Sequence, residues 1–328
     1  MKIYLTGHTG FIGSHLKERL QTSGHELILP NIDLREHEKI RDHVKLTQPD
    51  VIVHLAARTE VQDSFYEQTT FSDVNYTGTV NLIEAAREVP NLKNFVFAST
   101  MEVYGWQPIS DSIRDGLDSQ TRIELENGVH VFDENTSPNP NAPYAVAKYG
   151  CEKYLEYAHR SYGLPFTALR QTNSYGRRDN NFFVTEQIIY QMLTNPTDVY
   201  LGYSEPWRNF LHIEDLLDVW CLIIENPEKC IGEIFCLGPN NPISIEDYAN
   251  LIADKLDWHG TIHWNTKQPR PGEIYLLNST SDKIKNALGW EPRIGLSEGL
   301  DKTIAIWKEK LIDTPVELDR KNNLGRRH

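Results

Sequence analysis

The sequence is poor in cysteine and has no long apolar run. Four of its 328 residues are cysteines, at positions 151, 221, 230 and 236. They show neither the CxxC spacing of a metal or redox site nor the density of a disulfide scaffold, so a reducing cytoplasm is the expected location and no metal site is expected. No stretch reaches the roughly 18 apolar residues of a membrane span, and residues 1–6 run into glycines too early for a signal peptide.

Basic residues are also in deficit. The chain has 33 lysines and arginines against 46 aspartates and glutamates, which gives a net charge of −13. This balance disfavours binding to a nucleic-acid backbone, although a local basic pocket can still hold a small anion. The length and an apolar fraction of 39% are enough for a sizeable core. We therefore expect a soluble protein that binds neither nucleic acid nor a membrane.

Short apolar runs alternate with amphipathic stretches over the first 170 residues. The apolar runs predict strands at 2–6, 26–29, 51–55, 94–99 and 166–170. Helical patterns lie between them, at about 12–23, 36–47, 74–89 and 144–162. Strands that are apolar on both faces and alternate with helices predict a parallel sheet covered on both sides, in a doubly wound α/β fold of the Rossmann type.

From residue 171 the pattern is less regular, with many prolines and two clear helical stretches, at about 214–226 and 297–311. We interpret 171–312 as mainly a smaller α+β, substrate-binding region, with a helix at about 211–228 that returns to the first domain. Residues 313–328 are predicted to form a loose tail.

Residues 106–142 separate a predicted strand from the next helix by more than an ordinary connection. Within this insertion, Asn127-Gly128 lies between alternating apolar residues, which is the strongest short-range signal for a β-hairpin. Two interpretations are open: a surface hairpin, or a flap that covers the active site.

A glycine-rich segment, Thr6-Gly-His-Thr-Gly-Phe-Ile-Gly13, joins the first predicted strand to the first helix. Gly7, Gly10 and Gly13 permit a tight turn, a close approach of the backbone to a pyrophosphate, and close packing of helix on strand. The N–H groups at the start of the helix would then face the anion. This strand–turn–helix context predicts that residues 1–170 form a dinucleotide-binding domain.

The acidic residue that would bind an adenosine ribose is missing after the second predicted strand, which ends Leu29-Pro30-Asn31. A carboxylate there would favour NAD, and an arginine would favour NADP. Because no arginine replaces the acid, NAD is the favoured cofactor, and NADP stays open. Asp33, slightly further on, has two interpretations: an acceptor for the adenine amine, or the N-cap of the next helix.

Tyr144 and Lys148 are four residues apart, so they lie on the same face of the predicted helix. A free tyrosine titrates at about 10 and is a poor base at neutral pH. A neighbouring ammonium and an oxidised nicotinamide are both cationic and would stabilise the phenolate. The pair could then remove a hydroxyl proton while a hydride leaves the same carbon for NAD+.

Further motifs follow in a characteristic order. They are His54-Leu-Ala-Ala57, Asn75-x-x-Gly78-Thr79, Ser99-Thr-x-Glu-Val-Tyr-Gly105, Thr172-Asn-Ser-Tyr-Gly176, Trp207-Arg-Asn-Phe-Leu-His212 and Arg270-Pro-Gly-Glu273. Together with the glycine-rich segment and the tyrosine–lysine pair, they resemble the extended short-chain dehydrogenase/reductases, and within these the nucleotide-sugar epimerase/dehydratase family. The resemblance runs from residue 1 to about residue 310.

The resemblance implies roles for individual residues. Phe11 and Ile12 would offer backbone N–H groups to the cofactor pyrophosphate, and Thr100 would hydrogen-bond the sugar hydroxyl that is oxidised. Further cofactor contacts would come from Asp33, Leu34, Ala56, Ala57, Arg58, Ser99, Tyr144 and Lys148. The diphosphate of a nucleotide-sugar substrate would be held by Asn173, Arg208 and Arg270. Bidentate arginines suit such a doubly charged group in an acidic protein.

The resemblance also implies that the sugar is first oxidised, usually at C4. Glu102 resembles the glutamate of 4,6-dehydratases that removes the C5 proton and helps to expel the C6 hydroxyl. Met101 departs from the pattern, because some dehydratases place an aspartic acid there and methionine cannot donate a proton. We favour a 4,6-dehydratase, with a 4-epimerase as the main alternative. Decarboxylation, stable oxidation at C4 and a non-catalytic dinucleotide sensor are lesser alternatives.

A homodimer is the expected assembly, because the family that this chain resembles pairs through helices. The helices near 76–89 and 144–160 carry four apolar residues that could contact a second copy: Val80, Ile83, Tyr149 and Leu155. In the alternative interpretation all four face the sheet.

Overall fold

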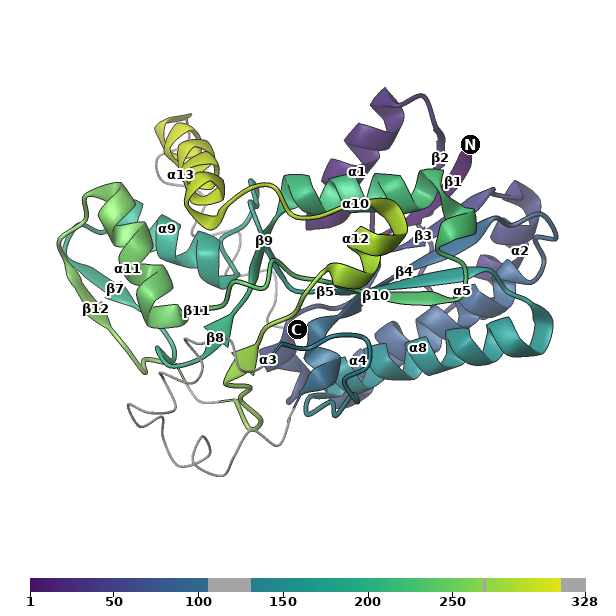
Figure 1. The fold of residues 1–328 in the computed structure, drawn as a ribbon, viewed down its shortest axis with the longest axis horizontal. Helices are drawn as coiled ribbons and strands as arrows, with labels where there is room; N and C mark the ends of the chain where they lie inside the picture. Colours follow the sequence, from purple (N-terminus) through teal and green to yellow (C-terminus); the bar gives the residue numbers. More distant parts are fainter. Residues whose placement is uncertain (106–130, 268–269, 314–328) are drawn as a thin grey trace.

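The computed structural model describes residues 1–105, 131–267 and 270–313, and its centre is a six-stranded sheet (Figure 1). The strand order is β10 (Glu233–Leu237), β5 (Phe166–Gln171), β4 (Asn94–Thr100), β3 (Val51–His54), β1 (Lys2–Thr6) and β2 (Glu26–Ile28). Every neighbouring pair in this sheet is parallel. The five predicted strands are present, with ends that differ by at most one residue. The sixth, β10, comes from the second half, where the sequence predicts no strand.

Helices cover both faces of the sheet (Figure 1). One face carries α2 (His37–Thr47), α5 (Gly78–Ala86) and α8 (Pro143–Tyr162). The other carries α1 (Phe11–Thr22), α10 (Ile213–Glu225) and α12 (Asp282–Leu288). The central strands β3 and β4 are buried along their whole length, which the two covering layers explain. The predicted doubly wound α/β fold is confirmed.

A second, smaller core lies beside the sheet, on the left of Figure 1. It contains α9 (Val184–Thr194), α11 (Ile245–Leu256), α13 (Leu296–Asp313), β7 (Asp198–Tyr200) and β12 (Thr261–His263). Two small sheets complete the fold, one of β6 (Asn173–Tyr175) with β9 (Phe210–His212), the other of β11 (Ile243–Ser244), β8 (Trp207–Arg208) and β13 (Leu276–Leu277). Of the helices in this half of the chain, α10 packs on α1 against the main sheet.

Several short helices interrupt the regular pattern. They are α3 (Val61–Ser64), α4 (Gln68–Phe71), the π-helical η1 (Ser72–Thr77), and the 3₁₀ turns η2 (Met101–Tyr104) and η3 (Pro227–Lys229). The stretch 74–89, predicted as one helix, is therefore η1 followed by α5. A π-helical turn breaks the normal hydrogen-bond ladder. The carbonyl oxygen of Asn75 accepts instead from Thr79 Oγ1 at 2.6 Å and Cys151 Sγ at 3.2 Å.

The apolar residues expected to contact a second copy are only partly available. Ile83 and Leu155 are buried in the core under α5 and α8, so their predicted exposure is wrong. The large apolar side chains that are exposed on η1 and α8 are Tyr76, Val146 and Tyr157. Among the described helices, none combines the length and the apolarity needed to cross a bilayer.

The hairpin predicted around Asn127 lies outside the described residues. The chain after it is fixed next to η2. Phe132 stacks on Tyr104, with ring centroids 5.3 Å apart, and pairs with Ser279. Glu134 accepts a hydrogen bond from the backbone N–H of Cys236 at 2.6 Å. The end of the insertion is thus attached to β10 and to the turn that carries Glu102.

Candidate active site

The glycine-rich segment forms the turn between β1 and α1. Gly7 has a φ of +68°, and a Cβ there would lie 2.6 Å from the backbone nitrogen of Ala56. A Cβ on Gly13 would overlap the carbonyl oxygen of Gly7. Both contacts are with backbone atoms, so only glycine lets α1 pack this closely against the ends of β1 and β3.

The first turn of α1 is open to an anion. The helix begins at Phe11, and no side chain caps it, since the preceding residue is Gly10. The N–H groups of Phe11 and Ile12 have no partner within the helix and carry its partial positive charge. Together with the closely packed glycines, these groups fit the pyrophosphate of a dinucleotide.

A buried chain of hydrogen bonds lies next to this turn and stabilises it. The ring of His54 is hydrogen-bonded to Thr6 at 2.7 Å and to Thr79 at 2.8 Å. Burial lowers the pKa of His54 to about 3, and the nearby ammonium of Lys148 adds to the effect. The ring is therefore neutral at physiological pH and ties the end of β1 to α5.

The loop after β3 carries Ala56, Ala57 and Arg58, and its backbone is held by hydrogen bonds to Asn75. The side chain of Asn75 accepts from the N–H of Arg58 at 2.8 Å and donates to its carbonyl at 2.9 Å. The guanidinium of Arg58 pairs with Glu67. The π-helical turn of η1 thus places one asparagine so that it fixes this side of the predicted cofactor cleft.

Asp33 and Leu34 follow β2. The carboxylate of Asp33 accepts from the guanidinium and the backbone N–H of Arg35, which lowers its pKa to about 2. The cap of α2 is Glu36, so the interpretation of Asp33 as the N-cap is wrong. Leu34 is buried. A Cβ on Gly78 would lie 2.9 Å from the Cβ of Leu34.

Tyr144 lies in the first turn of α8, next to the end of β4. Burial raises the pKa of its phenol, a hydrogen bond with Thr100 opposes this, and the carboxylates of Glu102 and Glu60 raise the pKa further. The groups of the protein alone therefore keep the phenol protonated. The predicted shift toward the phenolate does not come from them.

Lys148 lies one helical turn further along α8 and is buried. Its ammonium donates to the carbonyl oxygen of Ala98 at 2.7 Å and lies 4.7 Å from the centre of the Phe97 ring. Burial lowers the pKa of Lys148 to about 8, although Cys151 and Glu152 counteract it. Ser99 follows Ala98 in β4, and its hydroxyl donates to the carboxylate of Glu152. Glu152 also forms a buried ion pair with Arg170 at 2.7 Å.

Glu102 occupies the turn η2, directly after β4. Its backbone N–H donates to the hydroxyl of Thr100 at 3.2 Å. Burial raises the pKa of the Glu102 carboxyl, the charges of Arg270 and Arg208 lower it, and Glu273 raises it again. The carboxyl of Glu102 is thus close enough to the charges of both arginines, and to the phenol of Tyr144, to interact with them electrostatically.

Arg208 and Arg270 share one carboxylate. Glu273 lies 3.0 Å from Arg208 and 3.9 Å from Arg270. Arg208 is buried in β8, which lowers the pKa of its guanidinium, and Glu273 and Glu102 oppose this shift. Glu273 is not among the predicted site residues, although its place in the motif Arg270-Pro-Gly-Glu273 is a signal from which it could be predicted. Asn173 begins β6 and pairs with Phe210, two residues beyond Arg208.

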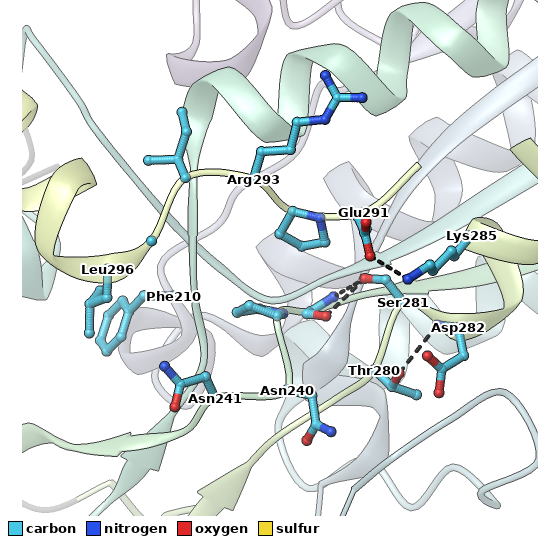
Figure 2. Close-up of a pocket in the computed structure, with 15 residues that line it drawn as sticks. Phe210, Asn240, Asn241, Thr280, Ser281, Asp282, Lys285, Glu291, Arg293 and Leu296 are labelled. Atoms are coloured by element: carbon cyan, nitrogen blue, oxygen red, sulfur yellow. Dashed lines mark hydrogen bonds and ion pairs between the residues drawn. The ribbon is translucent and has the colours of Figure 1, made fainter. Parts of the chain in front are cut away.

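A hollow of about 340 Å³ lies elsewhere, between the loop after β10 and the segment that leads into α13 (Figure 2). Polar residues from both segments line it, and Lys285 and Glu291 form an ion pair across one side. The predicted site residues do not contribute to its lining. It is therefore a feature separate from the candidate active site.

Residues 3–238 match the model of the NAD dependent epimerase/dehydratase family. The chain belongs to this family. Its cofactor is NAD, in agreement with the prediction from the second strand. The glycine-rich turn, the uncapped α1 and the loop that carries Ala56 all lie within the matched residues.

Relatives of this epimerase/dehydratase include both kinds of enzyme. A putative UDP-glucose 4-epimerase of Methanocaldococcus jannaschii is 26% identical over 92% of this chain and 97% of its own length. The dTDP-glucose 4,6-dehydratase of Salmonella typhimurium is 28% identical, over 93% of this chain and 92% of its own. The crystal structure of UDP-glucose 4-epimerase with UDP-glucose from Thermotoga maritima is similar with a TM-score of 0.81 and 27% identity, over 95% of this chain and 100% of the other.

Proposed function

We propose that this epimerase/dehydratase converts a nucleotide-diphosphate sugar through a transient 4-keto intermediate, as a 4,6-dehydratase. The observation that carries the proposal is the gathering of Thr100, Glu102 and Tyr144 with Arg208 and Arg270. A phenol and a carboxyl suit proton transfer at a sugar, and paired arginines suit the diphosphate attached to it. The names of the relatives, which refer to nucleotide sugars, support the same substrate class.

We assign NAD to the region 1–170, together with α10, and the nucleotide sugar mainly to 171–312. Phe11 and Ile12 would donate to the pyrophosphate of NAD, and the loop of Ala56 and Arg58 would line the cleft. When bound, NAD supplies the acceptor for the electrons of a sugar carbon. The nicotinamide half would lie toward Tyr144, because α8 and the end of β4 form that side of the site.

The first proton transfer is assigned to Tyr144. Its phenolate would accept the proton of the sugar C4 hydroxyl, and Thr100 would hydrogen-bond the same oxygen. Since burial raises the pKa of Tyr144, this role requires added positive charge close to the phenol. An oxidised nicotinamide would provide that charge when bound, together with the ammonium of Lys148.

The second proton transfer is assigned to Glu102. The C4 ketone acidifies C5, so the carboxylate can take the C5 proton and pass it to the departing C6 hydroxyl, which leaves as water. The two electrons removed at C4 return at C6 as hydride while a proton from solvent adds at C5, so the overall conversion is redox-neutral. The raised pKa of Glu102 suits a group that both accepts and donates a proton. One carboxyl would perform both tasks because Met101 has no proton to give.

A 4-epimerase is the second candidate. It is favoured by Met101, which is buried in an apolar cluster with Val103 and Phe132. The segment Arg270-Pro-Gly-Glu273 also resembles several epimerases. In this case the ketone would be reduced again at C4 from its other face, and Glu102 would carry out no chemistry at C5.

The test is a product screen. The purified chain is incubated in D₂O with GDP-, UDP-, dTDP- and CDP-hexoses, and the products are separated from the substrate by chromatography and weighed by mass spectrometry. Loss of one water with one solvent deuterium retained at C5 supports the dehydratase. An isomer without solvent deuterium identifies the epimerase, and conversion of none of the sugars contradicts the proposal. Glu102→Gln is the matched variant: it should abolish water loss but leave epimerisation largely intact.

We also propose that the chain forms a homodimer through η1, α5 and α8. These elements lie side by side on one face of the sheet (Figure 1). Val146 and Tyr157 are 55% and 49% exposed there, and Tyr76 is 38% exposed. Burial of these apolar side chains against a second copy would stabilise the pair.

A further inference from the structure

Arg177 connects the two halves of the candidate site, although neither the sequence motifs nor the proposed reaction gives it a role. It follows β6, directly after Gly176, and its side chain is only 9% exposed. A buried guanidinium must be stabilised by specific partners, because its transfer from water is costly. The partners of Arg177 come from both halves.

The faces of the guanidinium are covered by two aromatic rings. Its central carbon lies 4.2 Å from the ring centre of Phe11 and 3.8 Å from that of Phe183. Phe11 is the first residue of α1, whose open N–H groups face the predicted pyrophosphate site. Phe183 directly precedes α9 in the smaller core. A planar guanidinium can stack on two rings at once, which a lysine ammonium cannot do.

The edge of the guanidinium is fixed to the smaller core. Nη1 donates to the carbonyl oxygen of Ser174 at 2.7 Å and lies 3.3 Å from the carboxylate of Glu186 in α9. Glu186 also accepts from the backbone N–H of Gly176 and Arg177, at 3.0 and 2.9 Å. Trp307 of α13 donates to the carbonyl oxygen of Arg177 at 2.9 Å.

The hydrogen bonds of Arg177 alone do not offset the free energy that burial of its guanidinium costs. Among the residues that the structure describes, the Nε–H of Arg177 has no hydrogen-bond partner, and its burial therefore costs free energy. The stack of Phe11, Arg177 and Phe183 offsets that cost. An arginine anchored in the smaller core is thereby held against the first residue of the cofactor helix.

We propose that Arg177 is a positioning residue that couples NAD binding at α1 to nucleotide binding at Asn173 of β6, next to the Ser174 carbonyl that Arg177 holds, through the stack of Phe11, Arg177 and Phe183. A ligand that fixes the first turn of α1 also fixes the stack, and with it the start of α9. Such coupling is reciprocal, so each ligand raises the affinity for the other by the same factor. The part that concerns the sugar nucleotide rests on the proposed function, whereas the part that concerns NAD does not.

The first test is the affinity for NAD in the absence of any sugar nucleotide. Phe183→Leu removes one ring and leaves the ion pair of Arg177 with Glu186 intact. Phe182→Leu is the matched control, since its ring is 49% exposed and contacts Phe183 edge-on, outside the stack. By titration calorimetry, Phe183→Leu should raise the Kd for NAD by about 3-fold or more, as loss of one cation–π contact implies. The control should stay near wild type.

The second test is the coupling factor. UDP and dTDP serve as probes, and the Kd of each is measured with and without NAD. In the wild type NAD should tighten their binding, and in Phe183→Leu and Arg177→Lys this factor should approach one. Arg177→Lys keeps the charge beside Glu186, so a merely structural role would change the melting temperature but not the coupling.

Two results would overturn the proposal. One is a wild-type Kd for NAD in folded Phe183→Leu, and the other is a coupling factor that is one in the wild type or unchanged in both variants. If neither UDP nor dTDP binds the wild type, GDP and CDP replace them as probes, and the proposed function fails if none of the four binds. The comparison of Phe183→Leu with Phe182→Leu in NAD binding then still decides the role of the stack.

Discussion

At the scale of single residues, burial favours the uncharged form of the three ionisable side chains that the proposed chemistry needs. It raises the pKa of Tyr144 and of Glu102 and lowers that of Lys148 to about 8. A site of this kind responds strongly to any charge that a bound molecule brings. The phenol in particular becomes a base only when a cation lies against it.

Tyr144→Phe should lower turnover by roughly 100-fold or more, because general base catalysis by a positioned side chain contributes about that much. The ring still fills its buried place, so the free energy of unfolding should change by less than about 1 kcal/mol. Tyr157→Phe, exposed on the same helix, is the control. Turnover of Tyr144→Phe close to wild type would remove the phenol from the mechanism.

Lys148 should make stability depend on pH in the alkaline range. Its pKa of about 8 in the folded chain lies below the unfolded value of about 10.4, so the unfolded chain binds the additional proton between them. The free energy of unfolding therefore rises with pH across this window. Relative to Lys148→Met, the wild type should gain roughly 2 kcal/mol between about pH 7.5 and about pH 10 in urea unfolding. A difference independent of pH would contradict the buried ammonium.

Site residues can be predicted from the sequence where their functional partners are close along the chain. Tyr144 and Lys148 share a helix face, and the glycines share one turn, so spacing alone reveals them. Glu273 contacts Arg208, and Arg177 contacts Phe11. Both partners are far away in the sequence, so only the folded chain reveals these contacts. The hydrogen bond from the ammonium of Lys148 to the carbonyl oxygen of Ala98 likewise joins a helix to a strand far away in the sequence.

At the scale of elements, the first five strands are predictable because each contains a short apolar run, which is buried along its whole length in β3 and β4 and only partly buried in the edge strand β2. β10 is harder to predict, since only part of it is buried and it lies among prolines. The π-helical turn η1 cannot be predicted from the sequence, because its apolar and polar residues follow the pattern of an ordinary α-helix. Its consequence, the two hydrogen bonds between Asn75 and Arg58, is visible only in the structure.

Gly13→Ala tests the packing of α1 on the turn that precedes it. The added methyl group would overlap the carbonyl oxygen of Gly7, so the helix must move away. We expect a loss of about 1–3 kcal/mol in the free energy of unfolding, as for other overpacked sites, together with weaker NAD binding. Gly202→Ala is the matched control, because no atom of the described residues lies within 4 Å of a Cβ at that position. Equal effects of the two variants would argue against the close approach.

At the scale of the whole molecule, the site lies where two cores meet. The larger core supplies Thr100, Glu102 and Tyr144 from β4, η2 and α8, and the smaller region supplies Arg208 from β8. The family and the fold follow from the sequence, and the choice between elimination and epimerisation does not. That choice depends on where one carboxyl lies relative to C5 of a bound sugar.

The proposed dimer makes a prediction at the same scale. Val146→Glu would place a charge in the proposed interface and should shift sedimentation from dimer to monomer. Leu46→Glu on α2 is the control, since Leu46 is 81% exposed on a helix outside that interface. A wild-type chain that sediments as a monomer, or a Val146→Glu chain that stays dimeric, would rule out this surface.

The central claim is that one sugar carbon is oxidised and the same electrons return to the sugar. The most direct measurement uses a nucleotide hexose with deuterium at C4, taken from whichever sugar the product screen identifies, in ordinary water. The account predicts a product that keeps this deuterium, at C6 after water loss, with conversion slowed by the heavier isotope. A product whose deuterium has passed to the solvent would contradict the account.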